Sequence, residues 1–241
     1  MTVSLWVILA LGLAVGLGAL TQSAIGFGLA VVAAPFVVLV EPSLMPVGLL
    51  VGGFFLPLWE LVSNERDIDV RLLASAYGMR LLLTPIGVLL VAWAGAREIA
   101  LLVGVMILVV VVVSLTPHSV RASAPNALVA GAVTGVAGTA AAIGGPFLAL
   151  VLQHERPPRI RSTLAAFFVL GSATALIGLA IAGQVQATQL IAGAIWLPFI
   201  ALGVWLGRPV RRAILPTRMR KVVLGFCTVA SLVVIARALL G

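Results

Sequence analysis

The chain has 241 residues, of which 62% are hydrophobic and only 9% are charged. Soluble domains usually carry about 25% charged residues, so no single soluble core could bury this much apolar surface. No Lys or Arg precedes Arg66. The apolar N-terminus therefore lacks the charged start of a secretory signal peptide and is expected to remain in the mature protein. Composition predicts an integral membrane protein.

Charged and sulfur-containing residues exclude several other classes of function. Lys and Arg outnumber Asp and Glu by 15 to 7, but they lie in connectors between apolar runs and not on a face interleaved with aromatics. This excess indicates membrane topology and argues against nucleic-acid binding. The single cysteine, Cys227, is interpreted as a packing residue. Neither His118 nor His154 has metal-ligand spacing to a partner, so no metal or cofactor is expected.

Apolar runs follow one another along the chain, and about 20 helical residues span the hydrocarbon core of a bilayer. Six of the runs have the length of one crossing, whereas the first is too long and the fifth is long and interrupted. The runs are 4–40, 44–62, 72–93, 99–115, 127–152, 162–182, 187–206 and 222–240.

Glycine and proline interrupt the two unusual runs. The first contains Gly26-Phe27-Gly28 followed by Pro35, and the fifth contains Gly144-Gly145-Pro146. A helix loses regularity and hydrogen bonds at such places. We expect each run to be two half-helices around a non-helical tip, which is tolerated at membrane depth only when it is buried in protein or lines a wet cavity.

A short internal repeat divides the chain into two halves, 1–122 and 123–241. Four residues near the first tip recur near the second at a constant offset, and a later proline and tryptophan pair recurs at a slightly shorter one. The matched residues are Thr21, Ala24, Ile25 and Gly26 with Thr139, Ala142, Ile143 and Gly144, and Pro85 and Trp93 with Pro198 and Trp205.

Positive residues collect in cytoplasmic loops and so test the number of crossings. Eight simple crossings would divide the basic connector residues 10 to 4, whereas re-entrant first and fifth runs would divide them 12 to 2. We therefore expect an all-α membrane protein of two inverted repeats, each a re-entrant hairpin followed by three transmembrane helices. Both termini then face outside, and connectors 63–71, 116–126, 153–161 and 207–221 are cytoplasmic.

The glycine-rich segments carry a family resemblance. The segments GLGALTQSAIGFGLAVVAAP (16–35) and GAVTGVAGTAAAIGGP (131–146) resemble the paired motifs of the TauE/SafE sulfite-exporter family, and Arg159-Ile160-Arg161-Ser162-Thr163 resembles its arginine-containing connector. Gly26-Phe27-Gly28 departs from the three consecutive glycines of many members. The resemblance covers nearly the whole chain. It implies an inner-membrane permease for sulfite, sulfonates or related sulfur or carboxylate anions.

A half-helix N-terminus presents free N–H groups and the positive end of the helix dipole, which suits an anion. Arg80, inside the third run, is a further candidate, because charges at membrane depth are costly. Arg80 could instead snorkel to the surface or neutralise Glu60, and Arg161 could simply cap its helix. The expected substrate-binding residues are Thr21, Gln22, Ser23, Gly26, Phe27, Gly28, Arg80, Thr139, Gly144, Gly145, Pro146 and Arg161.

Three functional classes remain to be weighed. An intramembrane enzyme is disfavoured, because the chain has no His-Glu-x-x-His or Gly-x-Ser-x-Gly motif and no histidine at membrane depth. A non-transporting assembly or structural subunit would use the small residues only for helix packing. The preferred interpretation is a permease whose partners are a small anionic substrate and the lipid bilayer, with room for a homodimer.

Overall fold

The computed structural model describes residues 3–26, 28–63, 66–115, 120–213 and 216–240. This part of the chain contains ten α-helices, one short 3-10 helix and no strand. In chain order the elements are α1 (Leu5–Ile25), α2 (Leu29–Val40), η1 (Pro42–Leu44), α3 (Val47–Ser63), α4 (Val70–Trp93), α5 (Ala96–Leu115), α6 (Ala124–Ala140), α7 (Gly145–Val151), α8 (Pro157–Ile181), α9 (Ala187–Ala213) and α10 (Pro216–Leu240).

The two unusual apolar runs each form two helices. In the first run, α1 ends at Gly26, whose φ of 72° is left-handed, and Gly28, with a φ of 102°, precedes α2. These backbone conformations are readily adopted only by glycine, so the interruption follows from the sequence. In the fifth run α6 ends after Ala140, and α7 begins at Gly145 with a proline in its first turn.

Six helices are long and apolar enough to cross a membrane by length and composition. They are α1, α4, α5, α8, α9 and α10, whereas α2 and α3 are shorter. The sequence analysis predicts six crossings that include the run of α3 and leave out α1, which it treats as a half-helix. The six long helices of the structure include α1 in place of α3. The reason is that α1 continues without a break for 21 residues, while α3 has 17 residues because η1 and a loop take up the start of its apolar run.

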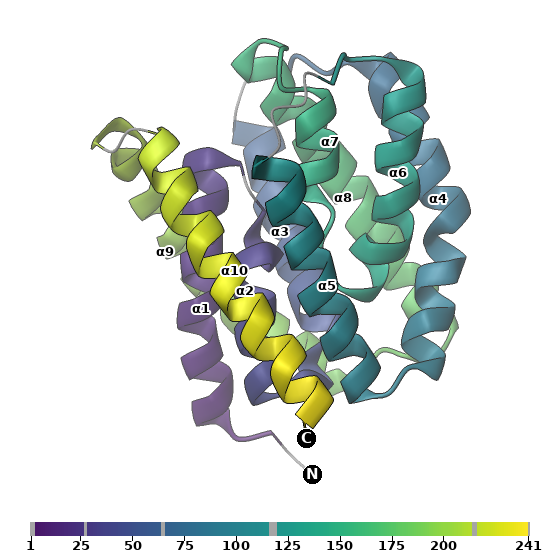
Figure 1. The fold of residues 1–241 in the computed structure, drawn as a ribbon, viewed down its shortest axis with the longest axis vertical. Coiled ribbons are helices and arrows are strands. Elements are labelled where there is room, and N and C mark those ends of the chain that lie inside the picture. Colours follow the sequence, from purple (N-terminus) through teal and green to yellow (C-terminus); the bar gives the residue numbers. More distant parts are fainter. Residues whose placement is uncertain (1–2, 27, 64–65, 116–119, 214–215, 241) are drawn as a thin grey trace.

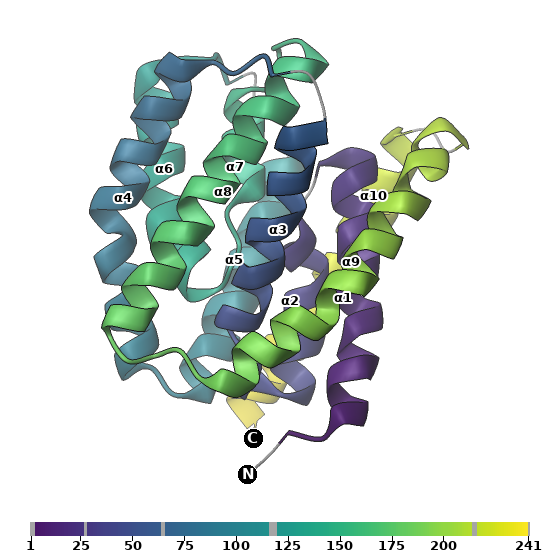
Figure 2. The same ribbon diagram turned by 180° about the vertical axis from the view of Figure 1, so that it is seen from behind.

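The helices alternate in direction along the chain. The start of α1 and the end of α10 lie together at the lower end of the molecule in Figure 1. The odd-numbered helices run upward and the even-numbered ones downward, a course that the reverse view in Figure 2 also shows. The junctions from α3 to α4, α5 to α6, α7 to α8 and α9 to α10 consequently lie at the upper end. Those junctions coincide with the four basic connectors.

Two closely packed helix pairs form the flanks of the molecule. In one pair, α1 packs on α9, and a Cβ on Gly12 would lie 2.8 Å from the ring of Phe199. In the other pair, α4 packs on α6, and a Cβ on Gly131 would overlap the carbonyl oxygen of Ala76. Gly16 and Gly135 make similarly close approaches to α9 and α4. These contacts indicate that the four glycines allow the helices of each pair to pack closely.

Two further pairs lie between the flanks, α3 with α8 and α5 with α10. The largest buried apolar cluster joins α1, α2, α5, α9 and α10, and a second joins α4, α6, α7 and α8. The break of each interrupted helix lies beside these inner helices, which is where the candidate site is found.

Candidate functional site

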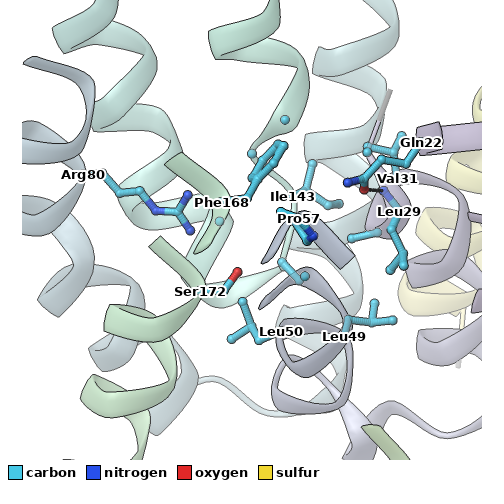
Figure 3. Close-up of a pocket in the computed structure, with 17 residues that line it drawn as sticks. Gln22, Leu29, Val31, Leu49, Leu50, Pro57, Arg80, Ile143, Phe168 and Ser172 are labelled. Carbon is cyan, nitrogen blue, oxygen red and sulfur yellow. Dashed lines mark hydrogen bonds between the residues drawn. The ribbon is translucent and has the colours of Figure 1, made fainter. Parts of the chain in front are cut away.

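A cavity of about 40 Å³ lies where the two helix breaks approach each other. A single water needs about 10–15 Å³ on this measure, so the cavity can hold a few waters or a small ion. Its wall comes from the start of α2, from α3, α4 and α8, and from the segment between α6 and α7 (Figure 3). A Cβ added to Gly145 would lie 3.7 Å from the Cα of Gly28, so the two breaks meet across this site.

Arg80 supplies the positive charge of the cavity. It lies in the middle of α4 and is only 2% exposed. Its guanidinium extends from α4 toward the cavity (Figure 3). Nη1 makes one long contact of 3.5 Å with the carbonyl oxygen of Phe167, and Cζ lies 4.8 Å from the Phe167 ring centroid. Nε has no hydrogen-bond partner among the residues that the structure describes. A buried charge with so few partners is costly and is a candidate for ligand binding.

Two glycines make room for the guanidinium. A Cβ on Gly171 of α8 would overlap the guanidinium atoms of Arg80. A Cβ on Gly138 of α6 would lie 3.3 Å from Nη2. Arg80 belongs to the first half of the chain, yet the residues that surround its guanidinium belong to the second half. Among the described residues no ion pair involves Arg80, so the alternative pairing with Glu60 is not present in this structure.

Gln22 closes the start of α2 from the last turn of α1. Its Oε1 accepts a hydrogen bond of 2.7 Å from the backbone N–H of Leu29, the first residue of α2. Because the donor is an N–H, the amide oxygen must face Leu29 and the amide NH2 must face elsewhere. Figure 3 shows the amide nitrogen on the side of Ile143 and Phe168, toward the cavity. Gln22 therefore presents donors to a ligand.

The N-terminal residues of α2 also line the cavity. Gly28, Leu29, Ala30 and Val31 all belong to its wall. The first N–H groups of a helix have no partner within the helix, and the helix dipole places partial positive charge there. Together with Arg80 and the Gln22 amide, this end of α2 makes the electrostatics of the cavity suitable for an anion.

The second break contributes a tightly packed, mostly apolar wall. Ala142 has a φ of 58°, and Ile143, Gly144 and Gly145 follow it along the cavity. A Cβ on Gly144 would overlap the methyl group of Thr134, so this glycine also permits packing within the second half. A Cβ on Gly145 would lie 3.0 Å from the ring of Phe168. α7 has only seven residues, so this break provides shape more than helix dipole.

The structure brings five of the expected residues to the cavity, namely Gln22, Gly28, Arg80, Gly144 and Gly145. Six others lie outside its wall. Thr21 donates to the carbonyl oxygen of Gly18, and Ser23 contacts Val204 of α9. Thr139 and Pro146 are buried, and the Thr139 hydroxyl has no partner among the described residues. Gly26 and Arg161 are exposed. Phe27 lies outside the described residues.

Several cavity residues were not expected from the sequence. Leu49, Leu50, Gly53 and Pro57 come from α3, and Phe168 and Ser172 come from α8. Gly53 and Pro57 could have pointed to α3 from the sequence. Glycine and proline within a membrane helix often mark a close approach of another helix or an irregular backbone. Phe168 and Ser172 carry no comparable signal.

The arginine-containing connector joins the halves at the upper end of the molecule. Arg159 Nε lies 3.1 Å from Oδ1 of Asp67. The hydroxyls of Ser162 and Thr163 accept hydrogen bonds from the backbone N–H groups of Asp67 and Asp69. The start of α8 thus holds the junction between α3 and α4, and Arg161 itself points to solvent or membrane surface.

A comparison with protein families identifies the chain over nearly its full length. The model of the family described as sulfite exporter TauE/SafE matches residues 8–234. This match confirms the resemblance found in the glycine-rich segments. No curated protein and no solved structure gives a significant match.

Proposed function

Because the chain belongs to the sulfite exporter TauE/SafE family, we propose that it carries a small anion across the cytoplasmic membrane. Sulfite, an organosulfonate or a related carboxylate fits this proposal. The family consists of transporters, and six helices are long and apolar enough to cross a bilayer, so the protein is a multi-pass membrane protein. The observation that carries the proposal is the unpaired guanidinium of Arg80 beside a cavity between two helix breaks.

The cavity supplies three kinds of group for an anion. Arg80 offers a full positive charge, Gln22 offers amide donors, and the first turn of α2 offers the N–H groups that follow Leu29, whose own N–H is bound by Gln22. In a water-poor site such donors bind an anion more strongly than they would at an aqueous surface. The glycines at both breaks let the backbone approach the ligand closely.

An inverted repeat gives this site a means of alternating access. If the halves are 1–122 and 123–241, helix α1 corresponds to α6. In the same order, α2 corresponds to α7, α3 to α8, α4 to α9 and α5 to α10. The packing of α1 on α9 then matches that of α6 on α4, and α3 on α9 matches α8 on α4. Corresponding helices run in opposite directions (Figure 1). These relations support two halves that rock around a central site, as in other secondary transporters.

Access to the cavity would then be controlled at its two ends. At the upper end the Asp67–Arg159 pair and the Ser162 and Thr163 hydroxyls join the halves. We infer that this end, with its basic connectors, is cytoplasmic, that the termini are outside, and that the breaks lie near the midplane. We propose that these contacts restrict access to the cavity from this end in the described conformation.

Radiolabelled sulfite flux into proteoliposomes tests the proposal. The native protein should take up sulfite, and Arg80→Gln should lower uptake about a hundredfold, the scale seen when a preorganised charge donor is removed. Arg97→Gln is the matched control, because Arg97 is exposed at the start of α5 and away from the cavity wall. A structural subunit would show no protein-dependent flux of any of the anions named above, and that result would reject the permease.

A further inference from the structure

Arg80 is the only charged residue in the wall of the cavity, as far as the described residues define that wall. The other polar side chains there are the neutral Gln22 and Ser172. Both ion pairs found among the described residues belong to Arg159, at the upper end of the molecule. The cavity therefore holds one full positive charge, and none of the described residues in its wall carries a negative charge.

Charge balance in a buried site depends on the number of full charges. A ligand with one negative charge would neutralise Arg80 and leave no net charge in the cavity. A ligand with two would leave one negative charge uncompensated, and uncompensated charge in a poorly hydrated site is strongly unfavourable. The first turn of α2 contributes only about half a positive charge, so it does not replace a second cation.

The rest of the wall reinforces this limit. Leu49, Leu50, Pro57, Ile143 and Phe168 are apolar and cannot solvate a second charge. The donors that remain, the Gln22 amide and the start of α2, can orient an oxyanion but carry no full charge. Backbone and amide dipoles stabilise charge less than a paired ion does at the same distance.

We propose that the cavity selects singly charged anions over doubly charged anions of similar size, and that Arg80 sets this selection. The inference rests on the proposed transport function and deepens it, because it assigns the charge state in which the substrate is bound. For sulfite, whose second proton dissociates near neutrality, the bound form is hydrogen sulfite. Permanently singly charged sulfonates bind regardless of pH.

Binding at different pH values tests the proposal without any substitution. Equilibrium binding of sulfite and of methanesulfonate to the purified, detergent-solubilised protein is measured below and above neutrality. Total sulfite should bind about tenfold more tightly below neutrality, while methanesulfonate should bind equally at both. Arg80 is the only titratable side chain that lines the cavity among the described residues, and Tyr77, three residues earlier on α4, lies outside the wall. Methanesulfonate controls for titration of the protein.

A pair of variants tests the same idea through the protein's charge. Perchlorate and sulfate have the same shape and differ in charge, so their affinity ratio reports charge selection. Ser172→Lys adds a second positive charge to the wall, and Ser172→Met is the uncharged control of similar length. The preference for perchlorate over sulfate should fall about tenfold in Ser172→Lys only. Intrinsic differences in ion hydration are the same for both variants.

The outcomes separate the inference from the transport proposal. Sulfite that binds more tightly above neutrality, or equally at both pH values, overturns the charge selection while leaving anion transport intact. If Ser172→Lys does not fold, the pH comparison in the native protein still decides. If methanesulfonate and sulfite neither bind nor cross the membrane at any pH, the proposed function falls and this inference with it.

Discussion

Gly28 and Gly145 face each other across the cavity, so that a Cβ on Gly145 would lie 3.7 Å from the Cα of Gly28. The two residues belong to different halves and lie at the breaks of two different interrupted helices. Their missing side chains keep the breaks close while leaving space for a ligand. A larger residue at position 145 would project between the phenyl ring of Phe168 and the start of α2.

Gly145→Val is expected to reduce sulfite flux about tenfold or more while most of the protein stays folded, because overpacking at one side of an existing cavity costs about 1–3 kcal/mol. Gly225→Val is the control, since a Cβ there meets nothing within 4 Å. Flux and size-exclusion profiles measure the two effects. Equal losses of flux and of monodisperse protein in Gly145→Val would assign this glycine to packing alone.

Substitutions at Gln22 should separate its capping role from its ligand role. Gln22→Leu removes the acceptor of the Leu29 N–H, and an unsatisfied buried donor costs about 1–3 kcal/mol, so the melting temperature should fall. Gln22→Glu keeps an acceptor for Leu29 but places negative charge beside the cavity. It should remain folded and lose anion binding. If Gln22→Glu binds methanesulfonate as tightly as the native protein, the side chain does not face the ligand.

The fit of Arg80 against Gly171 predicts a non-additive pair of substitutions. Gly171→Ala would overlap the guanidinium and should lower the melting temperature. In an Arg80→Leu background the same alanine has no guanidinium to displace, and its effect should be small. A double-mutant cycle of unfolding measurements on the native protein, the two single variants and the double variant gives the coupling free energy. For residues in contact this coupling is about 0.5–3 kcal/mol. If the effects of the two substitutions on stability are additive, the guanidinium does not pack against Gly171.

The Asp67–Arg159 contact should restrict access from the upper end. Asp67→Asn weakens it, and the rate at which an impermeant thiol reagent modifies Ser172→Cys from that side should rise several-fold, in a Cys227→Ala background. Each side chain of the pair is more than a third exposed, so the pair contributes little to stability and folding should be retained. Glu98→Gln, at the opposite end, is the control and should leave the rate unchanged.

Membrane orientation can be tested by labelling single cysteines in the same background. Arg66→Cys and Lys221→Cys should react from the cytoplasmic side, and Ala182→Cys from the outside. All three positions are exposed. Ala182 directly follows α8, and the turn from α8 to α9 lies at the lower end of the molecule in Figure 1. Reaction of positions 66 and 221 from opposite sides would reject the inverted arrangement, because the two connectors would then lie on different faces of the membrane.

The sequence predicts the site best where a residue is unusual in its own surroundings. Arg80 is a charge within an apolar run, Gln22 is polar within another, and Gly28 and Gly145 interrupt helices, so each could be found without knowing the fold. Phe168 and Ser172 could not, because an aromatic and a small polar residue are ordinary in a membrane helix. Only the packing of α8 against α3 and α4 brings them to the cavity.

The internal repeat does not predict which of its matched residues line the cavity. Thr21 and Thr139 match in sequence, but Thr21 donates to Gly18 while the Thr139 hydroxyl is buried without a partner, and neither lines the cavity. Spacing identifies corresponding positions along two helices. It does not predict which side of each helix faces its neighbours.

The seat of Arg80 also constrains how relatives of this protein can diverge. The guanidinium occupies the space that a side chain at position 171 would otherwise fill, and it lies close beside Gly138. A family member with a side chain at position 171 cannot keep the guanidinium in this position. A member without arginine at position 80 does not need glycine at position 171. Positions 80 and 171 should therefore vary together across the family, with glycine at 171 wherever arginine stands at 80.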